Sequence, residues 1–228
     1  MNYQKKMDYS YSLGSFPTFE LCEKKPEVVR VIYLHPQAND SIKSKITHIA
    51  AREKIEIIED EKFFKSLSKD NIFLAAKFSK YKSCLEEKNH LILHQPEQLG
   101  NLGTIFRSAL AFGIEDIAII DPSCDSFHPS TIRASMGAFF SLRTENFNSI
   151  EDYQKRFDNK IYAFMTGDHP HLKETSLASP YSLLFGSESS GLPQDYEKRF
   201  KPIKIKMSPQ VDSLNLSLAV AIALHHLY

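Results

Sequence analysis

Residues 183–193 read LLFGSESSGLP, and this stretch decides the class of fold. An apolar run typical of a buried strand passes directly into a loop that contains Gly186, Glu188 and Gly191, and Pro193 suits the first turn of a following helix. Loops at the carboxyl ends of parallel strands hold the ligands of α/β proteins. The loop is not a P-loop, because it lacks Gly-Lys-Ser/Thr, and the chain contains no GxGxxG. Taken alone, the stretch is better explained as an ordinary turn with a glycine C-cap.

Apolar runs of strand length alternate with helical periods on both sides of this stretch. Strands are predicted at residues 28–34, 55–58, 72–78, 90–94, 116–120, 160–165, 182–185 and 203–206, and helices at 39–54, 59–67, 102–112, 130–136, 150–157 and 213–228. This order predicts an α/β fold with a mainly parallel sheet covered by helices on both faces. Residues 79–89 are polar and aperiodic. We therefore expect a linker there, between a small α/β domain at residues 1–82 and a second α/β domain at residues 89–228.

The chain has 228 residues, of which 42% are hydrophobic and 25% charged, as in an average globular protein. It has no run of about 18 or more apolar residues and begins with a polar segment, so we expect neither a membrane span nor a secretory signal. The three cysteines are Cys22, Cys84 and Cys124, and they form no CxxC pair, which favours a reducing cytoplasm. The paired histidines lack further ligands at zinc-like spacing, so no metal site is predicted.

The formal net charge of zero gives nucleic-acid binding no independent support. Residues 1–88 carry 16 Lys and Arg against 13 Asp and Glu, and residues 89–228 carry 12 against 15. This small asymmetry permits an RNA-handling N-terminal domain without establishing one. Residues 77–82 interleave Lys77, Lys80 and Lys82 with Phe78 and Tyr81, as in a strip of cations and stacking rings. A solvated linker explains that segment better.

The last predicted helix has almost no polar side, because residues 214–224 are apolar apart from Asn215 and Ser217. A helix that is apolar all round is buried on all sides. In a chain of this size a second subunit is the most plausible cover. We therefore favour a homodimer over a monomer.

Residues 101–109 read NLGTIFRSA and combine polar residues with a helical period. Asn101 is predicted to cap the helix, and Gly103 allows close backbone approach. Arg107 then projects about a turn and a half further along, where its guanidinium suits a phosphate or a carboxylate. A capped helix with one exposed arginine explains the segment equally well.

Residues 203–207 (IKIKM) and 211–217 (VDSLNLS) form a third unusual segment. Ser213 is predicted as the N-cap of the final helix. Asn215 would lie in its first turn, where a buried amide needs a partner or a ligand. A cap with a satisfied buried asparagine is the alternative.

Each segment alone has an ordinary explanation, but in this order the three resemble the motifs of the SpoU (TrmH) family of SPOUT methyltransferases. That family has Asn-x-Gly-x-x-x-Arg, then Gly-x-Glu-x-x-Gly-Leu, then Ser-Leu-Asn-x-Ser. The corresponding residues here are Asn101, Gly103, Arg107; Gly186, Glu188, Gly191, Leu192; and Ser213, Leu214, Asn215, Ser217. Residues 132–138 (IRASMGA) also look like a family segment. The resemblance covers about residues 89–228, while residues 1–82 look like the small L30e-like substrate-binding domain without a diagnostic motif.

The resemblance implies a parallel α/β domain whose C-terminal part is threaded into a trefoil knot, which physical rules alone would not propose. It implies S-adenosyl-L-methionine as the cofactor, bent within the knot and held largely by backbone groups. The positions that match are Thr166, Gly167, Gly186, Ile205 and Leu214. Family members work as dimers through this domain, in agreement with the apolar final helix.

The implied reaction transfers a methyl group to a ribose 2′-hydroxyl of ribosomal or transfer RNA. The family assigns the role of base to the arginine that matches Arg107. A guanidinium with a pKa above roughly 12 hardly deprotonates, so a bidentate phosphate clamp is the safer role. We expect four residues to position Arg107 and the loops: Asn101, Glu188, Ser213 and Asn215. Glu188 would pair with Arg107 or with an asparagine amide.

Two positions depart from the family pattern. Lys206 stands where proline is common, and Ser189 where glycine is common. Neither belongs to the polar set, so we favour an active enzyme in the cytoplasm. A catalytically silent RNA-binding paralogue and a methyltransferase for a base or a small molecule remain as alternatives. The N-terminal domain favours ribosomal over transfer RNA.

Overall fold

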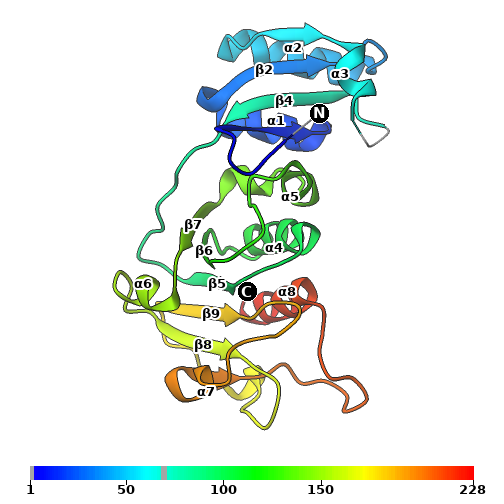
Figure 1. The fold of residues 1–228 in the computed structure, drawn as a ribbon. Helices are drawn as coiled ribbons and strands as arrows, with labels where there is room; N and C mark the ends of the chain where they lie inside the picture. Colours follow the sequence, from blue (N-terminus) through cyan, green and yellow to red (C-terminus); the bar gives the residue numbers. More distant parts are fainter. Residues whose placement is uncertain (1–2, 68–70) are drawn as a thin grey trace. The chain divides into compact units, whose positions relative to one another are not determined.

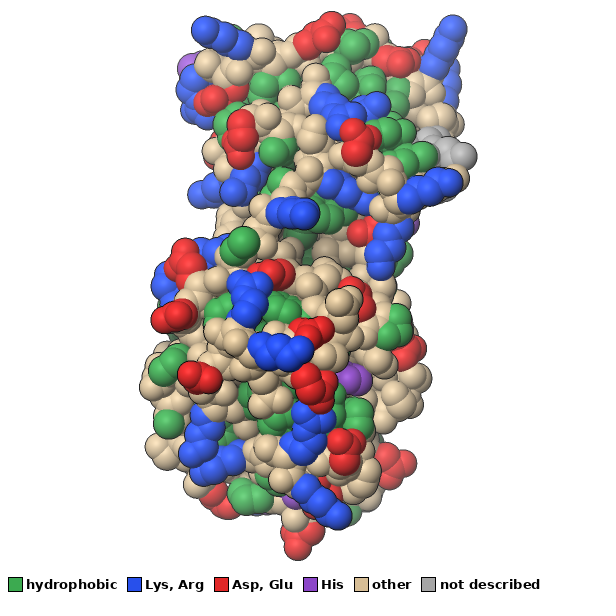
Figure 2. Space-filling view, turned by 60° about the vertical axis from the view of Figure 1, so that its left-hand side comes forward, with side chains coloured by type: hydrophobic (Ala, Val, Ile, Leu, Met, Phe, Trp, Pro, Cys, Tyr) green, Lys and Arg blue, Asp and Glu red, His purple; other side chains and the backbone are tan. Residues whose placement is uncertain are grey.

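The computed structural model describes residues 3–67 and 71–228. The chain forms two compact units, an N-terminal unit of Met1–Tyr81 with Asp125–Ser141 and a C-terminal unit of Lys82–Cys124 with Leu142–Tyr228. None of the helices within the described residues is long and apolar enough to cross a membrane. On the face drawn in Figure 2, Lys and Arg side chains are interspersed with Asp and Glu in each unit, as a formal net charge of zero leads one to expect.

The N-terminal unit contains a four-stranded sheet of order β1-β4-β2-β3 (Figure 1). Strand β4 is antiparallel to β1 and β2, and β3 is parallel to β2. The strands are β1 (Tyr9–Leu13), β2 (Val29–Leu34), β3 (Ile57–Glu59) and β4 (Leu74–Ser79). The helices are α1 (Ser15–Lys24), α2 (Asp40–Glu53), α3 (Glu61–Lys65) and α5 (Pro129–Ala134), with the 3₁₀ turns η1 (Pro26–Val28) and η2 (Ala138–Ser141).

The two faces of this sheet differ in burial. Helix α1 packs against strands β1 and β4. On one face of the sheet the side chains are fully buried in the described structure, and they are Ser10, Ser12, Ile32, Ala76 and Phe78. The hydroxyls of Ser12 and Thr18 lie 2.9 Å apart, so a buried serine is satisfied within the unit. Polar serines on the buried face hide the usual alternation, which is why the sequence did not predict β1 or the helix α1 that follows it.

The C-terminal unit contains a six-stranded, all-parallel sheet of order β10-β8-β9-β5-β6-β7. Its strands are β5 (His90–His94), β6 (Asp116–Ile120), β7 (Arg143–Phe147), β8 (Lys160–Phe164), β9 (Tyr181–Phe185) and β10 (Lys201–Ile203). The predicted α/β class with a mainly parallel sheet is confirmed. Strand β7 was missed because its sequence, RTENF, is polar and only Phe147 is buried.

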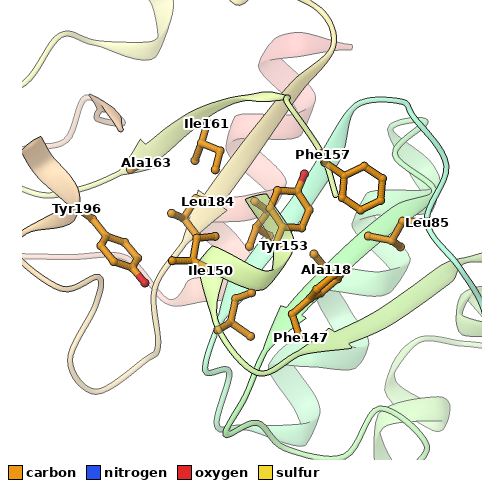
Figure 3. Packing of buried hydrophobic residues seen from close by; sticks show 12 residues of the cluster. Leu85, Ala118, Phe147, Ile150, Tyr153, Phe157, Ile161, Ala163, Leu184 and Tyr196 are labelled. Carbon is orange, nitrogen blue, oxygen red and sulfur yellow. The ribbon is translucent and has the colours of Figure 1, made fainter. Parts of the chain in front are cut away.

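Helices cover both faces of this sheet: α4 (Leu99–Ala111), α6 (Ile150–Gln154), α7 (Tyr196–Arg199) and α8 (Leu216–Leu227), with the 3₁₀ turn η3 (Leu172–Glu174). Helices α4 and α8 pack side by side (Figure 1). On the face of α6, Ile150 and Tyr153 lie over Ala118 and Leu184 (Figure 3). Ala118 of β6 and Leu184 of β9 lie in one row on either side of Ile92 of β5, so a continuous apolar layer covers the central strands.

A buried ion pair ties the start of β6 to the edge strand β7. Both carboxylate oxygens of Asp116 accept from Arg143, at 2.7 Å from Nε and 2.6 Å from Nη2, and the amide of Glu86 donates to Asp116 at 3.0 Å. The side chain of Asp116 is 1% exposed. Burial alone would raise its pKa, but the hydrogen bonds from Arg143 and Glu86 prevail and lower it.

We predict that Arg143→Met lowers the free energy of unfolding by about 3 kcal/mol at pH 7, because it leaves the buried Asp116 carboxylate without its counter-ion. A carboxylate with a lowered folded-state pKa stabilises the fold above its unfolded pKa of about 4, and this contribution is lost as the pH falls. Urea unfolding should therefore show the variant approaching the wild type at acid pH. Lys155→Met is the control, since its pair with Asp152 is exposed. Equal losses in both variants would contradict the prediction.

Candidate functional site

A cleft of about 1070 Å³ opens in the C-terminal unit, beyond the carboxyl ends of β8 and β9. Its walls come from the loops after these strands and from the chain between β10 and α8. All five positions that the family resemblance assigns to the cofactor line it: Thr166, Gly167, Gly186, Ile205 and Leu214. Phe185 adds a further apolar wall and Ser187 a polar one.

Gly186 is required by the path of the backbone. A Cβ atom at this position would lie 2.1 Å from the carbonyl carbon of Gly191 and 2.4 Å from the nitrogen of Leu192. The loop closes on itself there, since the amide of Ser187 donates to the carbonyl of Gly191 at 3.3 Å and the amide of Gly191 donates back at 3.1 Å. Gly191 has φ +67°, in the left-handed region that favours glycine. The two glycines of LLFGSESSGLP thus allow a tight loop at the cleft.

A chain of hydrogen bonds joins the three polar segments at the mouth of the cleft. The Asn101 side chain donates from Nδ2 to Oε1 of Glu188 at 2.9 Å, and its Oδ1 accepts from Nδ2 of Asn215 at 3.1 Å. Asn215 in turn accepts from the amide and the hydroxyl of Ser217, at 2.9 and 2.7 Å. Residues far apart in the sequence thus form one network.

Glu188 anchors this network. Its carboxylate also accepts from the backbone amides of Glu97 at 2.9 Å and Gln98 at 3.2 Å. Burial acts to raise its pKa, but the hydrogen bonds from Asn101 and the amides outweigh burial and lower it. Reversing the Asn101 amide would set its oxygen against this carboxylate, so the network also fixes the orientation of that amide. Of the two partners expected for Glu188, the structure selects the asparagine amide.

Both predicted helix caps were wrong. Helix α4 begins at Leu99 after Gln98, so Asn101 lies in its first turn and its side chain is directed to Glu188 instead of to a cap. The cap of α8 is Asn215, whose side-chain oxygen accepts from the amide of Ser217, and Ser213 lies in the exposed segment before it. Ser213, Glu188 and Asn215 do line the cleft.

Arg107 is exposed on α4 and is not among the residues that line the cleft. The structure therefore does not bring it together with the other members of the predicted polar set. Its proposed role as a phosphate clamp remains a prediction.

Sequence reasoning missed Lys204. Its Nζ donates to the carbonyl of Gly167 at 2.9 Å, and its backbone amide donates to the carbonyl of Pro170 at 2.9 Å. The lysine thereby pins the loop that forms one wall of the cleft. Pairing of Lys204 with His171 also replaces the predicted continuation of the strand to residue 206, and β10 ends at Ile203. The alternation in IKIK places Lys204 and Lys206 on the same side of an extended chain, so it gives no sign that Lys204 alone is bound.

The two departures from the family pattern lie at the surface. Lys206 is exposed. Ser189 is exposed as well, and its hydroxyl donates to the carboxylate of Glu97, so it adds a link between the loop after β9 and the loop before α4. Neither residue interrupts the network of Asn101, Glu188 and Asn215.

We predict that Asn101→Asp destabilises the protein more than Asn101→Ala at pH 7. The alanine variant loses hydrogen bonds, at a cost of about 1–2 kcal/mol, whereas the aspartate variant also sets a second carboxylate against Glu188. Two adjacent carboxylates raise one pKa, so the excess penalty is present at neutral pH and relieved as the pH falls below about 5. Thermal unfolding of both variants at the two pH values measures this. An aspartate variant as stable as the alanine variant at pH 7 would contradict the described contact.

Comparison with known proteins agrees with this geometry. The chain is 31% identical over 139 residues to an uncharacterized tRNA/rRNA methyltransferase of Synechocystis sp., covering 59% of this chain and 51% of the relative. It is 28% identical over 140 residues to the 23S rRNA (guanosine(2553)-2′-O)-methyltransferase of Bacillus subtilis, covering 60% of this chain and 56% of the relative. The chain thus spans about half the length of these curated relatives.

Solved structures match over nearly the whole chain. The SpoU methyltransferase AviRb from Streptomyces viridochromogenes, solved in complex with AdoMet, superposes with a TM-score of 0.82 at 19% identity, covering 96% of this chain and 88% of that one. At this identity the likeness shows the fold alone. The family model described as SpoU rRNA Methylase matches residues 88–225, which span the cleft and all three motifs. The chain therefore belongs to the SpoU rRNA Methylase family.

Proposed function

We propose that the protein is an RNA methyltransferase that uses S-adenosyl-L-methionine to methylate a ribose 2′-hydroxyl. The observation that carries this proposal is the network of Asn101, Glu188 and Asn215 at the mouth of a cleft lined by all the expected cofactor positions. The 23S rRNA 2′-O-methyltransferase of Bacillus subtilis, a relative over the same part of the chain, supports the same reaction.

The residues of the cleft fit the proposed cofactor. Ile205, Leu214 and Phe185 offer apolar walls for an adenine ring, and Gly186 allows the tight loop that brings its neighbour Ser187 to the cleft. Bound there, S-adenosyl-L-methionine supplies an electrophilic methyl group. The trefoil knot also belongs to this proposal, which takes it from the resemblance of residues 89–228 to the SpoU family.

Within this proposal the polar residues have two roles, to position the loops of the cleft and to contact the RNA. Glu188 is held by Asn101 and two backbone amides, and its lowered pKa makes it a poor proton acceptor. We therefore assign it, with Asn101 and Asn215, to positioning the loops, and Ser213 to the cleft wall. Arg107 presents an exposed guanidinium that suits a bidentate phosphate contact and stabilisation of the developing alkoxide.

Ribosomal RNA is the favoured substrate within this proposal. A structure described as methylating C/U34 of tRNA matches 60% of this chain but 91% of its own length, so that relative has little beyond the shared region. A structure described as an AdoMet-bound rRNA methyltransferase from Sinorhizobium meliloti matches 97% of this chain and 88% of its own. The N-terminal unit, which the longer match includes, is the part we assign to RNA binding.

Incubation with labelled S-adenosyl-L-methionine and total RNA, followed by digestion to nucleosides, tests the reaction. We expect label on a 2′-O-methyl nucleoside derived from ribosomal RNA. Arg107→Ala should reduce transfer by at least about a hundredfold, as loss of a charge-stabilising donor does, with cofactor affinity nearly unchanged. Arg52→Ala, which removes an exposed arginine from α2, is the control. Label on a base, or on no RNA, would refute the proposed reaction, and full transfer by Arg107→Ala would refute the role of that residue.

A homodimer formed through the C-terminal unit is also part of the proposal. In the single chain only one side of α8 is covered, since Leu218 is 56% and Ile222 45% exposed while Val220 and Ala223 are fully buried. The exposed pair is spaced as one side of a helix, opposite the side that packs on α4. A second copy is the occupant that the family resemblance suggests for this strip.

We predict that Leu218→Arg converts the dimer to a monomer, because an interface leaves a buried guanidinium without a partner. Sedimentation at several protein concentrations measures the mass. Phe16→Arg changes an exposed apolar residue of the N-terminal unit and should leave the mass unchanged. A wild-type protein that is monomeric at every concentration would rule out the dimer.

A further inference from the structure

The second face of the N-terminal sheet carries a cluster of half-exposed rings and cations. Register places Tyr9 opposite Ser79 and Tyr11 opposite Lys77 across β1 and β4, on the face away from the buried Ser10 and Phe78. We propose that this tyrosine face, formed by Tyr9, Tyr11, Lys77 and Arg30, binds unpaired nucleotides of the RNA substrate. The inference rests on the proposed function and deepens it.

The cations of the tyrosine face are held against its rings. The ammonium of Lys77 lies 3.9 Å from the centroid of the Tyr9 ring, and the guanidinium carbon of Arg30 lies 5.5 Å from the same centroid. Arg30 also donates to the hydroxyl of Ser79 at 2.8 Å and pairs with Asp8 at 2.7 Å. Positive charge is thus fixed beside an aromatic ring, the combination that grips a phosphate next to a stacked base.

The two tyrosines pack differently. Tyr11 packs against the apolar cluster that includes Phe64, and its ring centroid lies 5.9 Å from that of Phe63. Tyr9 is the ring that contacts the cations, its centroid lies 5.7 Å from that of Tyr11, edge to face, and both tyrosines are half-buried. Burial, followed by the effect of Tyr9 and Tyr33, raises the pKa of Tyr11 to about 12. The Tyr11 hydroxyl therefore stays neutral at physiological pH and adds no charge that would repel a phosphate.

The two ends of this sheet face differ. Toward β3, the ring of Tyr33 stacks on that of Phe63, with 4.1 Å between the ring centroids. The pKa of Tyr33 is raised by burial first and then by the charges of Asp60 and Glu56. Because Phe63 stacks on the Tyr33 ring, a base that stacked on that side would have to displace it. We therefore place the RNA at the β1 and β4 end, over Tyr9 and Lys77.

The face suits single strands better than duplexes. Stacking on a side chain requires a base that is not already paired and stacked within a helix. In this proposal Tyr9 stacks on one base, and Lys77 beside it binds an adjoining phosphate. The interleaved strip suggested by residues 77–82 does not form, because Phe78 is fully buried on the opposite face and the Tyr81 hydroxyl is buried too. Of that segment, Lys77 is the residue that joins the tyrosine face.

Fluorescence anisotropy with the full chain and a labelled single-stranded RNA of about twelve mixed nucleotides, free or annealed to its complement, tests the inference. We expect the single strand to bind more tightly than the duplex. Tyr9→Leu should weaken single-strand binding about tenfold, the effect of losing one stacking ring, whereas Tyr9→Phe should retain it. Lys77→Gln should lower the slope of log affinity against log salt by about 0.7, the value for one phosphate on a single strand.

Matched controls exist on the α1 and α2 side of the same unit, where Lys45 lies 4.4 Å from the Phe19 ring centroid. Lys45→Gln and Phe19→Leu should leave RNA affinity unchanged. If Tyr9→Leu and Lys77→Gln bind like the wild type while methyl transfer to RNA persists, the tyrosine face is refuted and the proposed function stands. Tighter binding of the duplex also refutes it. If the wild type neither binds RNA nor methylates it, the proposed function fails first.

Discussion

The carboxylate of Glu188 accepts hydrogen bonds from three residues of one stretch, 97–101, which is remote from it in the sequence, and the geometry of the cleft depends on this. Through Oε1 it holds Asn101 and the amide of Gln98, and through Oε2 the amide of Glu97. Asn101 passes the connection on to Asn215 and so to the start of α8. Because a charged acceptor is stabilised by several donors at once, the loops after β5 and β9 and the segment before α8 are held in one arrangement.

The fold supplies the frame in which that anchor works. Strands β5 and β6 are buried along their entire length, and β9 is buried from Ser182 to Phe185, so the loops at their carboxyl ends start from a rigid base. At the end of β9 the chain turns so sharply that Gly186 has no room for a side chain. Lys204 fixes the neighbouring loop through the carbonyl of Gly167. The loops of this cleft are held largely by hydrogen bonds to backbone groups, which is why so few of its walls are conspicuous in the sequence.

Sequence reasoning reached the C-terminal unit more fully than the N-terminal one. Apolar runs such as the one within residues 116–120 predict buried parallel strands, and this strand was predicted at its correct position. Strand β1 was missed because its buried side chains are Ser10 and Ser12, whose cost is offset by hydrogen bonds that only the fold provides. The motifs identified the polar residues of the site. They could not show that the Asn101 side chain donates to Glu188 instead of capping α4, or that Arg107 lies outside the cleft lining. Both depend on the direction of a side chain in three dimensions.

The division of the chain into units has a consequence for how the protein can be taken apart. Residues Asp125–Ser141 belong to the N-terminal unit although the chain on either side of them belongs to the C-terminal unit. The hydroxyl of Ser10 donates to the carbonyl of Phe127, and the backbone at Gly137 passes against Pro17 and Glu20. The two units are therefore not two consecutive segments of the chain. Cutting the chain after Tyr81 would strip the inserted segment of its packing partners, so neither unit can be exchanged between relatives as an independent module.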